Sequence, residues 1–119
     1  MTAPNIAGLT TVTGKTAVQA VGTSATAIVT NSAASGKVFK INSLIISNID
    51  GSAAADITVD IFRSSTAYHI AKTVTVDADS SFSAIDRNLQ IYLEEGDSLR
   101  LTASAASDLE AICSYEEIS

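Results

Sequence analysis

The sequence contains very few of the residues that most often carry out chemistry in proteins. Its 119 residues include no Trp and only one each of Cys, Pro and His. Cys113 cannot form an internal disulfide, and it lies in an alternating apolar run typical of the buried face of a strand. One His and one Cys cannot make up a transition-metal site of ordinary composition. We therefore expect a protein that is not an enzyme, with no catalytic residue, no metal and no cofactor.

Positive charge is scarce, and it is unevenly distributed. Seven Lys and Arg stand against thirteen Asp and Glu, which gives a net charge of −6 and argues against a nucleic-acid partner. Every acidic residue follows position 49, whereas the only charged side chains in the first 49 residues are Lys15, Lys37 and Lys40. This division suits an assembly in which a weakly basic segment meets an acidic face of a neighbour. The same uneven distribution would also result if the N-terminal segment, which is rich in Thr, Ala and Ser, simply lacked charged residues.

Long apolar runs are also missing. No stretch approaches the roughly 18 consecutive apolar residues that a membrane-spanning helix requires. Residues 1–7 have neither the basic start nor the apolar core of a signal peptide. We therefore expect that the protein has no membrane contact. We also expect that it is made in a reducing cytoplasm.

Short alternating apolar segments are what the sequence does contain. They predict strands over 10–21, 26–30, 37–49, 57–61, 70–76, 82–85, 89–93, from 99 onward and over 109–116. Turn signals separate them, among them Asp50-Gly51 and Gly96, which can adopt the positive φ of a tight turn. About eight antiparallel strands at this spacing predict an all-β sandwich or barrel. Residues 1–9, which include Pro4, predict an extended arm before a single domain over 10–119.

The segment 37–49 is apolar on both faces. Phe39, Ile41, Ile45 and Ile49 share one face by alternation, while Leu44 and Ile46 lie on the other. Such a strand is either central in a sandwich or covered by another subunit. We therefore take the following residues of this strand and of the arm as the candidate interface: Ile6, Leu9, Phe39, Leu44 and Ile46.

Two acidic clusters resemble parts of active sites. Asp77 and Asp79 could offer oxygens to Ca²⁺, but further ligands at the required spacing are absent, which favours an acidic turn. Glu94, Glu95 and Asp97 could form a carboxylate pair for glycoside cleavage. Because they flank a hairpin glycine, we interpret them as a solvated turn.

Five segments carry a resemblance to a known group of proteins: MTAPNI at 1–6, SGKVFKINSLII at 35–46, IYLEEGD at 91–97, ASDLE at 106–110 and SYEEIS at 114–119. Together they resemble small virion structural proteins of tailed phages that infect marine bacteria, cyanobacteria among them. The resemblance implies a jelly-roll-like β-sandwich, made in the host cytoplasm and located in or on the virion. It carries over no functional residue, because that group has no active-site pattern.

Three functions fit these expectations. The first is a capsid decoration, or cement, protein that binds the outer shell and contacts the major capsid protein or other virion proteins. The second is a neck, tail or fibre component, a homo-oligomer in which three copies pack through the face of residues 44–46. The third is a glycan-binding module, for which Tyr68, Tyr92 and Tyr115 are the candidate aromatic residues.

Overall fold

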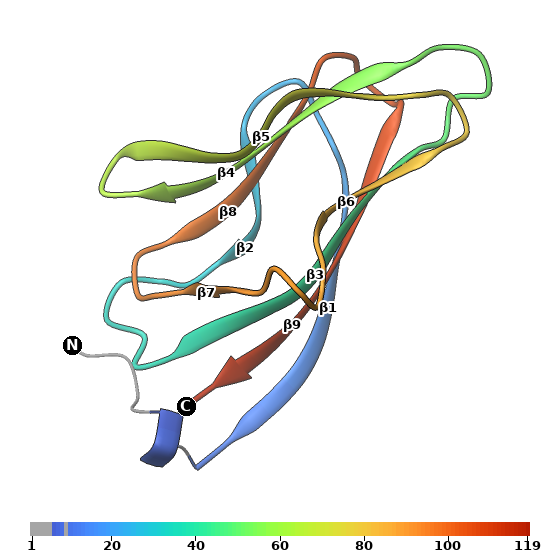
Figure 1. Cartoon of the computed structure of the whole chain (residues 1–119). Coiled ribbons are helices and arrows are strands. Elements are labelled where there is room, and N and C mark those ends of the chain that lie inside the picture. The colour runs from blue at the N-terminus through green and yellow to red at the C-terminus, as the bar shows by residue number, and fades with distance from the viewer. Residues whose placement is uncertain (1–5, 9) are drawn as a thin grey trace.

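A computed structural model describes residues 6–8 and 10–119, and it confirms the expected all-β sandwich of antiparallel strands (Figure 1). A short 3-10 helix, η1 (Ile6–Gly8), precedes the strands. The strands are β1 (Val12–Ala20), β2 (Thr26–Thr30), β3 (Val38–Asn48), β4 (Ala55–Arg63), β5 (Thr66–Val76), β6 (Ser81–Ile85), β7 (Ile91–Leu93), β8 (Ser98–Ala103) and β9 (Leu109–Ile118).

The strand order is that of a jelly roll. One sheet has the order β1-β9-β3-β6, with β7 also pairing with β3, and the other has the order β2-β8-β4-β5. The pairs β1–β9, β2–β8, β3–β6 and β4–β5 thus alternate between the two sheets, as in one long hairpin wound around the sandwich. The three-residue strand β7 is not part of this eight-strand jelly-roll pattern.

The apolar faces of the two sheets form one core. Its largest fully buried side chains come from both sheets: Ile41, Leu44, Ile46, Ile57, Ile85, Leu93, Leu99, Leu101, Leu109, Val21, Val59 and Val76. Cys113 is buried in the same cluster, as its alternating run predicted. Burial at about 25 cal/mol per Å² makes this cluster the main source of stability.

A bulge in β3 changes which of its side chains face the core. The pairing of β3 with β9 shifts between Ile41 and Ser43, so one extra residue is inserted there. Ile41 is inward before the bulge, whereas Leu44 and Ile46 are inward after it and Ile45 is exposed. The prediction that Ile45 shares a face with Ile41 was therefore wrong, because strand alternation restarts after an inserted residue.

Two side chains have a burial unusual for their residue type. Asp60 of β4 is buried, and Arg100 of the neighbouring strand donates from Nε to its Oδ1 at 2.9 Å. The Arg100 guanidinium also lies 3.9 Å above the ring centre of Phe62. Leu89, the first residue of the strand predicted over 89–93, instead lies exposed in the loop before β7.

A buried asparagine holds the loops at one end of the sandwich. The Asn48 Nδ2 donates to the carbonyl oxygens of Ala53 and Val76, each at 2.9 Å, and its Oδ1 accepts the Asp50 N–H at 2.9 Å. Three backbone groups, two in the loop between β3 and β4 and one at the end of β5, are thereby satisfied by one side chain.

The N-terminal segment joins the sheet beside the C-terminus. The N–H groups of Thr10 and Thr11 both donate to the Ser119 carbonyl at 2.9 Å, and Figure 1 shows η1 beside the C-terminal end of β9. Of the arm predicted as extended, residues 6–8 are a 3-10 turn instead, and residues 1–5 and 9 lie outside the described residues. No helix among the described residues is long and apolar enough to cross a membrane.

Candidate interaction surfaces

The structure places most of the predicted interface residues in the core. Phe39, Leu44 and Ile46 are all buried between the two sheets. They are therefore not available to a partner, and the proposed packing of copies through residues 44–46 is corrected. Leu9 and the side chain of Ile6 lie outside what the structure describes.

An exposed apolar row crosses the outer face of the first sheet. It consists of Val18 of β1, Ile112 of β9 and Ile45 of β3, which are 74%, 50% and 39% exposed. Val18 is directly opposite Ile112, and Ile112 is directly opposite Ile45, so the three side chains are successive cross-strand neighbours. We refer to these three residues as the apolar row.

The apolar row borders a shallow hollow. The hollow measures about 250 Å³ and is lined by Val18, Gln19, Ala20, Ser47, Glu110, Ala111 and Ile112. On the outer face of its own strand, Val18 has only Thr16 and Ala20 beside it, and Ile112 has only Glu110 and Ser114. No local run of large apolar side chains therefore pointed to either residue. Only the strand register brings them together.

Strand β1, where the apolar row ends, is a long and regular sheet edge. Its nine residues pair with β9 without any register shift, and within the described residues β1 pairs with β9 alone. The pairings of the edge strands β2, β5 and β6 all contain register shifts, and the edge strand β7 has only three residues. Bulges, charges and short length are the usual protection of an exposed edge, and β1 has a single charged residue, Lys15.

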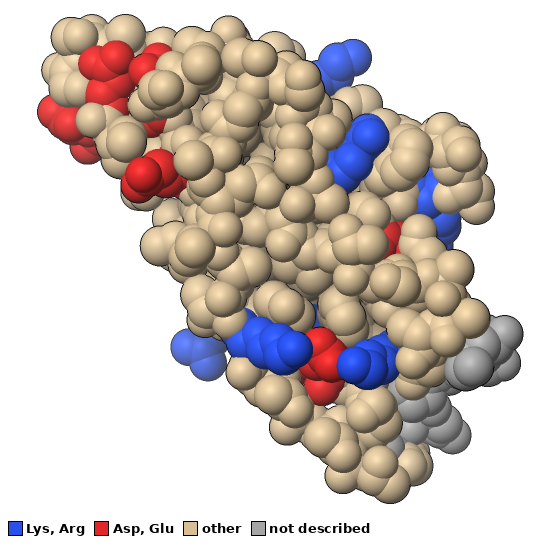
Figure 2. Space-filling view, turned by 180° about the vertical axis from the view of Figure 1, so that it is seen from behind, with Lys and Arg blue, Asp and Glu red and all other residues tan. Residues whose placement is uncertain are grey.

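The lysines of the first 49 residues are compensated within the chain. Lys15 and Lys37 lie 3.0 and 2.5 Å from the Glu117 carboxylate, and Lys40 lies 3.9 Å from Glu116. Hydrogen bonds from Lys37 and Lys15 lower the pKa of Glu117. Figure 2 shows acidic side chains grouped at one end of the molecule and alternating basic and acidic side chains near the other. The basic side chains of the first 49 residues and the acidic side chains of β9 therefore form ion pairs within the first sheet.

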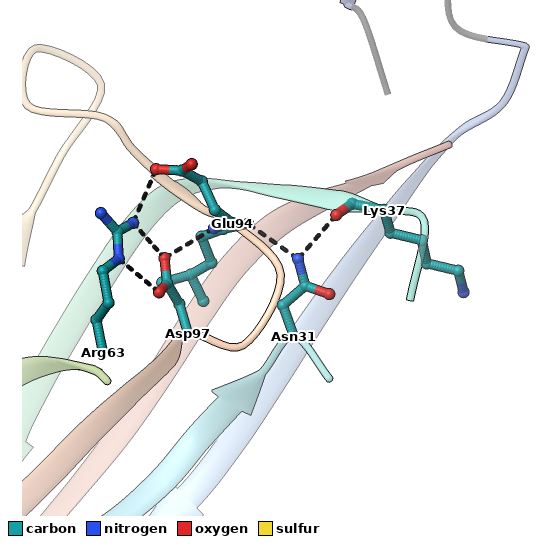
Figure 3. A network of polar contacts seen from close by, with 6 residues as sticks. Asn31, Lys37, Arg63, Glu94 and Asp97 are labelled. Carbon is teal, nitrogen blue, oxygen red and sulfur yellow. Dashed lines mark hydrogen bonds and ion pairs between the residues drawn. The ribbon is translucent and has the colours of Figure 1, made fainter. Parts of the chain in front are cut away.

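A buried aspartate organises the turn between β7 and β8 (Figure 3). The Asp97 side chain is 1% exposed. Arg63 donates to it from Nε at 2.7 Å and from Nη2 at 2.5 Å, and Nη2 also donates to Glu94 at 2.8 Å. The Asp97 carboxylate also accepts the Glu94 N–H at 2.9 Å. The prediction of a solvated turn is thus wrong for Asp97, although Gly96 has the positive φ, 88°, that the turn requires.

The electrostatics of this turn favour a charged Asp97. Burial by itself raises the pKa of Asp97, but the hydrogen bonds from Arg63 and the Glu94 N–H outweigh burial and leave the pKa below its ordinary value. The hydrogen bonds to Asp97 likewise raise the pKa of Arg63. The two groups therefore form a stable ion pair rather than an acid–base pair.

A second buried asparagine connects this turn to the start of β3. The Asn31 Nδ2 donates to the carbonyl of Lys37 at 2.9 Å, as Figure 3 shows, and to the carbonyl of Leu93 at 3.1 Å. Its backbone N–H donates to the Asp97 carbonyl at 2.9 Å, and its carbonyl accepts the Gly96 N–H at 2.8 Å. We refer to Asn31, Arg63, Glu94 and Asp97 together as the polar network.

Two of the three tyrosines lie in one hollow beside the polar network. Tyr68 and Tyr92 are 59% and 44% exposed, and Tyr115 instead packs against Phe39 with ring centres 5.5 Å apart. The hollow measures about 350 Å³ and is lined by Ile61, Arg63, Tyr68, Ile91 and Tyr92. We refer to it as the tyrosine hollow.

The other residues that could take part in chemistry are a buried cysteine, an exposed histidine and two aspartates of a turn. Burial raises the pKa of the Cys113 thiol to about 12, and His69 is exposed on β5. Asp77 and Asp79 are exposed in the turn between β5 and β6. Across residues 6–8 and 10–119, no three His, Cys, Asp or Glu side chains are grouped so that they could hold a metal ion.

Comparison with known proteins yields a similarity of fold. No protein-family model matches the sequence. No curated protein matches it either. Among solved structures, the chain is similar to a chain from Bacillus endospore appendages, which form disulfide-linked pili, with a TM-score of 0.53 and 14% sequence identity. The match covers 98% of this chain and 95% of that chain. At this identity the likeness shows a shared fold alone.

Proposed function

We propose that this chain is a non-enzymatic structural subunit that binds further subunits, copies of itself among them, through β1 and the apolar row. The observation that carries the proposal is that an exposed apolar row ends at β1, which among the described residues is the one long edge strand whose pairing is regular. Such an edge presents unpaired N–H and C=O groups, which another strand can satisfy.

Burial of the apolar row supplies the driving force for this contact. Val18 and Ile112 are at least half exposed, so covering them removes apolar surface from water at about 25 cal/mol per Å². Backbone pairing at β1 then sets the register of the contact. A closed assembly such as a trimer, the stoichiometry proposed from the sequence, would cover the apolar row in every copy.

The finer proposal concerns the particle in which the subunit works. The resemblance of five sequence segments to phage virion proteins supports a capsid decoration protein, made in the host cytoplasm, that binds the major capsid protein on the outer shell. The fold similarity to a chain of Bacillus pili supports only the broader class of assembled structures. Cys113 is buried, so the disulfide linkage of those pili does not carry over to this chain.

Light scattering after gel filtration tests the broader proposal. We expect an oligomer for the natural chain, a monomer for Val18→Lys, and an unchanged oligomer for Thr30→Lys, a matched variant at an exposed site of the other sheet. Because both positions are exposed, circular dichroism should show the same fold in all three proteins. A monomeric natural chain at high concentration, or an oligomeric Val18→Lys protein, would contradict the proposal.

The copy number in purified virions tests the finer proposal. Quantitative mass spectrometry should find this chain at an abundance comparable with the major capsid protein. A few copies per particle would instead assign it to the neck, tail or fibres. Absence from virions would reject a virion protein altogether.

A further inference from the structure

The exposed aromatic residues of this chain are concentrated in one place. The chain has three Phe, three Tyr and no Trp. Phe39, Phe62, Phe82 and Tyr115 are buried or half-buried, whereas both exposed rings, Tyr68 and Tyr92, line the tyrosine hollow. They come from β5 and β7, which belong to different sheets, so only the folded sandwich brings them together.

The tyrosine hollow has the size and lining of a small binding site. Its volume of about 350 Å³ lies at the lower end of the range, roughly 300–1,000 Å³, that is common for ligand sites. Ile61 and Ile91, both half-buried, give it an apolar part. Each exposed tyrosine adds a flat apolar ring and a hydroxyl that can donate and accept hydrogen bonds.

Arg63, one of the residues that line the hollow, adds a guanidinium held by the polar network. Its bonds to Asp97 and Glu94 use Nε and Nη2. Figure 3 shows the other terminal nitrogen, Nη1, pointing away from both carboxylates. The bidentate bond to a buried carboxylate holds the guanidinium in place before any ligand arrives, which lowers the entropy cost of binding.

We propose that the tyrosine hollow binds a neutral oligosaccharide. A sugar ring has apolar C–H faces, which stack on phenol rings, and hydroxyl groups, which pair with Arg63 Nη1 and the tyrosine hydroxyls. An anionic ligand fits less well, because Asp97 and Glu94 already compensate the charge of Arg63. A purely apolar ligand would leave the Arg63 donor unpaired. This function is additional to the proposed subunit contact, since the tyrosine hollow and the apolar row share no residue.

Nuclear magnetic resonance titration tests the proposal on the full chain. The probes are maltohexaose, cellohexaose and N-acetyl-chitohexaose, each added to the ¹⁵N-labelled protein. We expect at least one probe to give saturable shifts at residues that line the tyrosine hollow. Tyr68→Ala and Tyr92→Ala should each weaken that binding at least tenfold, a loss of about 1.4 kcal/mol. Leu89→Ala, which removes an exposed side chain outside the hollow, should leave it unchanged.

The outcomes separate this proposal from its alternatives. Absence of shifts with all three sugars would overturn it, and so would binding that both tyrosine variants retain. Shifts at the hollow with a casein tryptic digest but with none of the sugars would assign it to peptides and also overturn the proposal. The oligomeric state has its own test in Val18→Lys, so either proposal can fail while the other stands.

Discussion

Replacing Arg63 by alanine would remove the counter-charge of the buried Asp97. Breaking a fully buried ion pair from one side costs about 3–5 kcal/mol, because the remaining charge stays buried without a partner. Asp97 is 1% exposed, but the Arg63 side chain is 47% exposed, so water can replace part of the lost interaction. We therefore expect a smaller loss, about 2 kcal/mol of unfolding free energy at neutral pH. In a domain of this size that loss lowers the Tm by roughly 6–10 °C.

The pH dependence of this loss follows from the pKa of Asp97. In the natural protein the folded pKa of Asp97 lies below its ordinary value, so the pair contributes stability above the unfolded pKa and loses it as the pH falls through the folded pKa. Without Arg63, burial dominates and raises the pKa of Asp97. The difference between Arg63→Ala and the natural protein should therefore be largest near about pH 7 and shrink toward about pH 3.

Urea unfolding followed by circular dichroism at both pH values would measure this difference. Arg87→Ala is the matched control, because Arg87 is exposed in the loop before β7, and its effect should stay within about 0.5 kcal/mol. A loss below about 0.5 kcal/mol for Arg63→Ala at neutral pH would refute the reasoning. So would a loss that is the same at both pH values.

Two further predictions test the core. Leu44→Ala should lower the free energy of unfolding by about 2–5 kcal/mol because Leu44 is fully buried, whereas Ile45→Ala should cost about 1 kcal/mol or less because Ile45 is 39% exposed. Equal losses in urea unfolding would contradict the orientation of β3 after its bulge. The Cys113 thiol should not react with Ellman's reagent in the folded protein and should react fully in concentrated guanidinium chloride, because the reactive thiolate is disfavoured by burial. Rapid reaction without denaturant would show that Cys113 is accessible.

The strands themselves could be predicted from the sequence because apolar alternation is a local property. The strand expected over 26–30 is β2, and the alternating run around Cys113 does face the core. Gly96 was identified as the residue of positive φ in a turn, and its φ of 88° confirms it. In each case the responsible residues are close neighbours in the sequence.

The surfaces and the polar contacts depended on tertiary structure. The bulge near Ile41 reverses the orientation of the rest of β3, and nothing in the alternation around it marks where the extra residue is inserted. Asp97 looked like part of a solvated turn because its partner, Arg63, lies on another strand. The same holds for Tyr68 and Tyr92, which share a hollow only when the two sheets pack together.

The sequence by itself thus determined that this chain forms short antiparallel strands around one core, since side-chain alternation requires no knowledge of a strand's neighbours. Only the tertiary structure decided which side chains remain outside that core. Val18 and Ile112 are far apart in the sequence, and they form an apolar row because β1 and β9 pair in one particular register. Register is a relation between distant segments, and a shift of one residue would turn the whole row toward the opposite face.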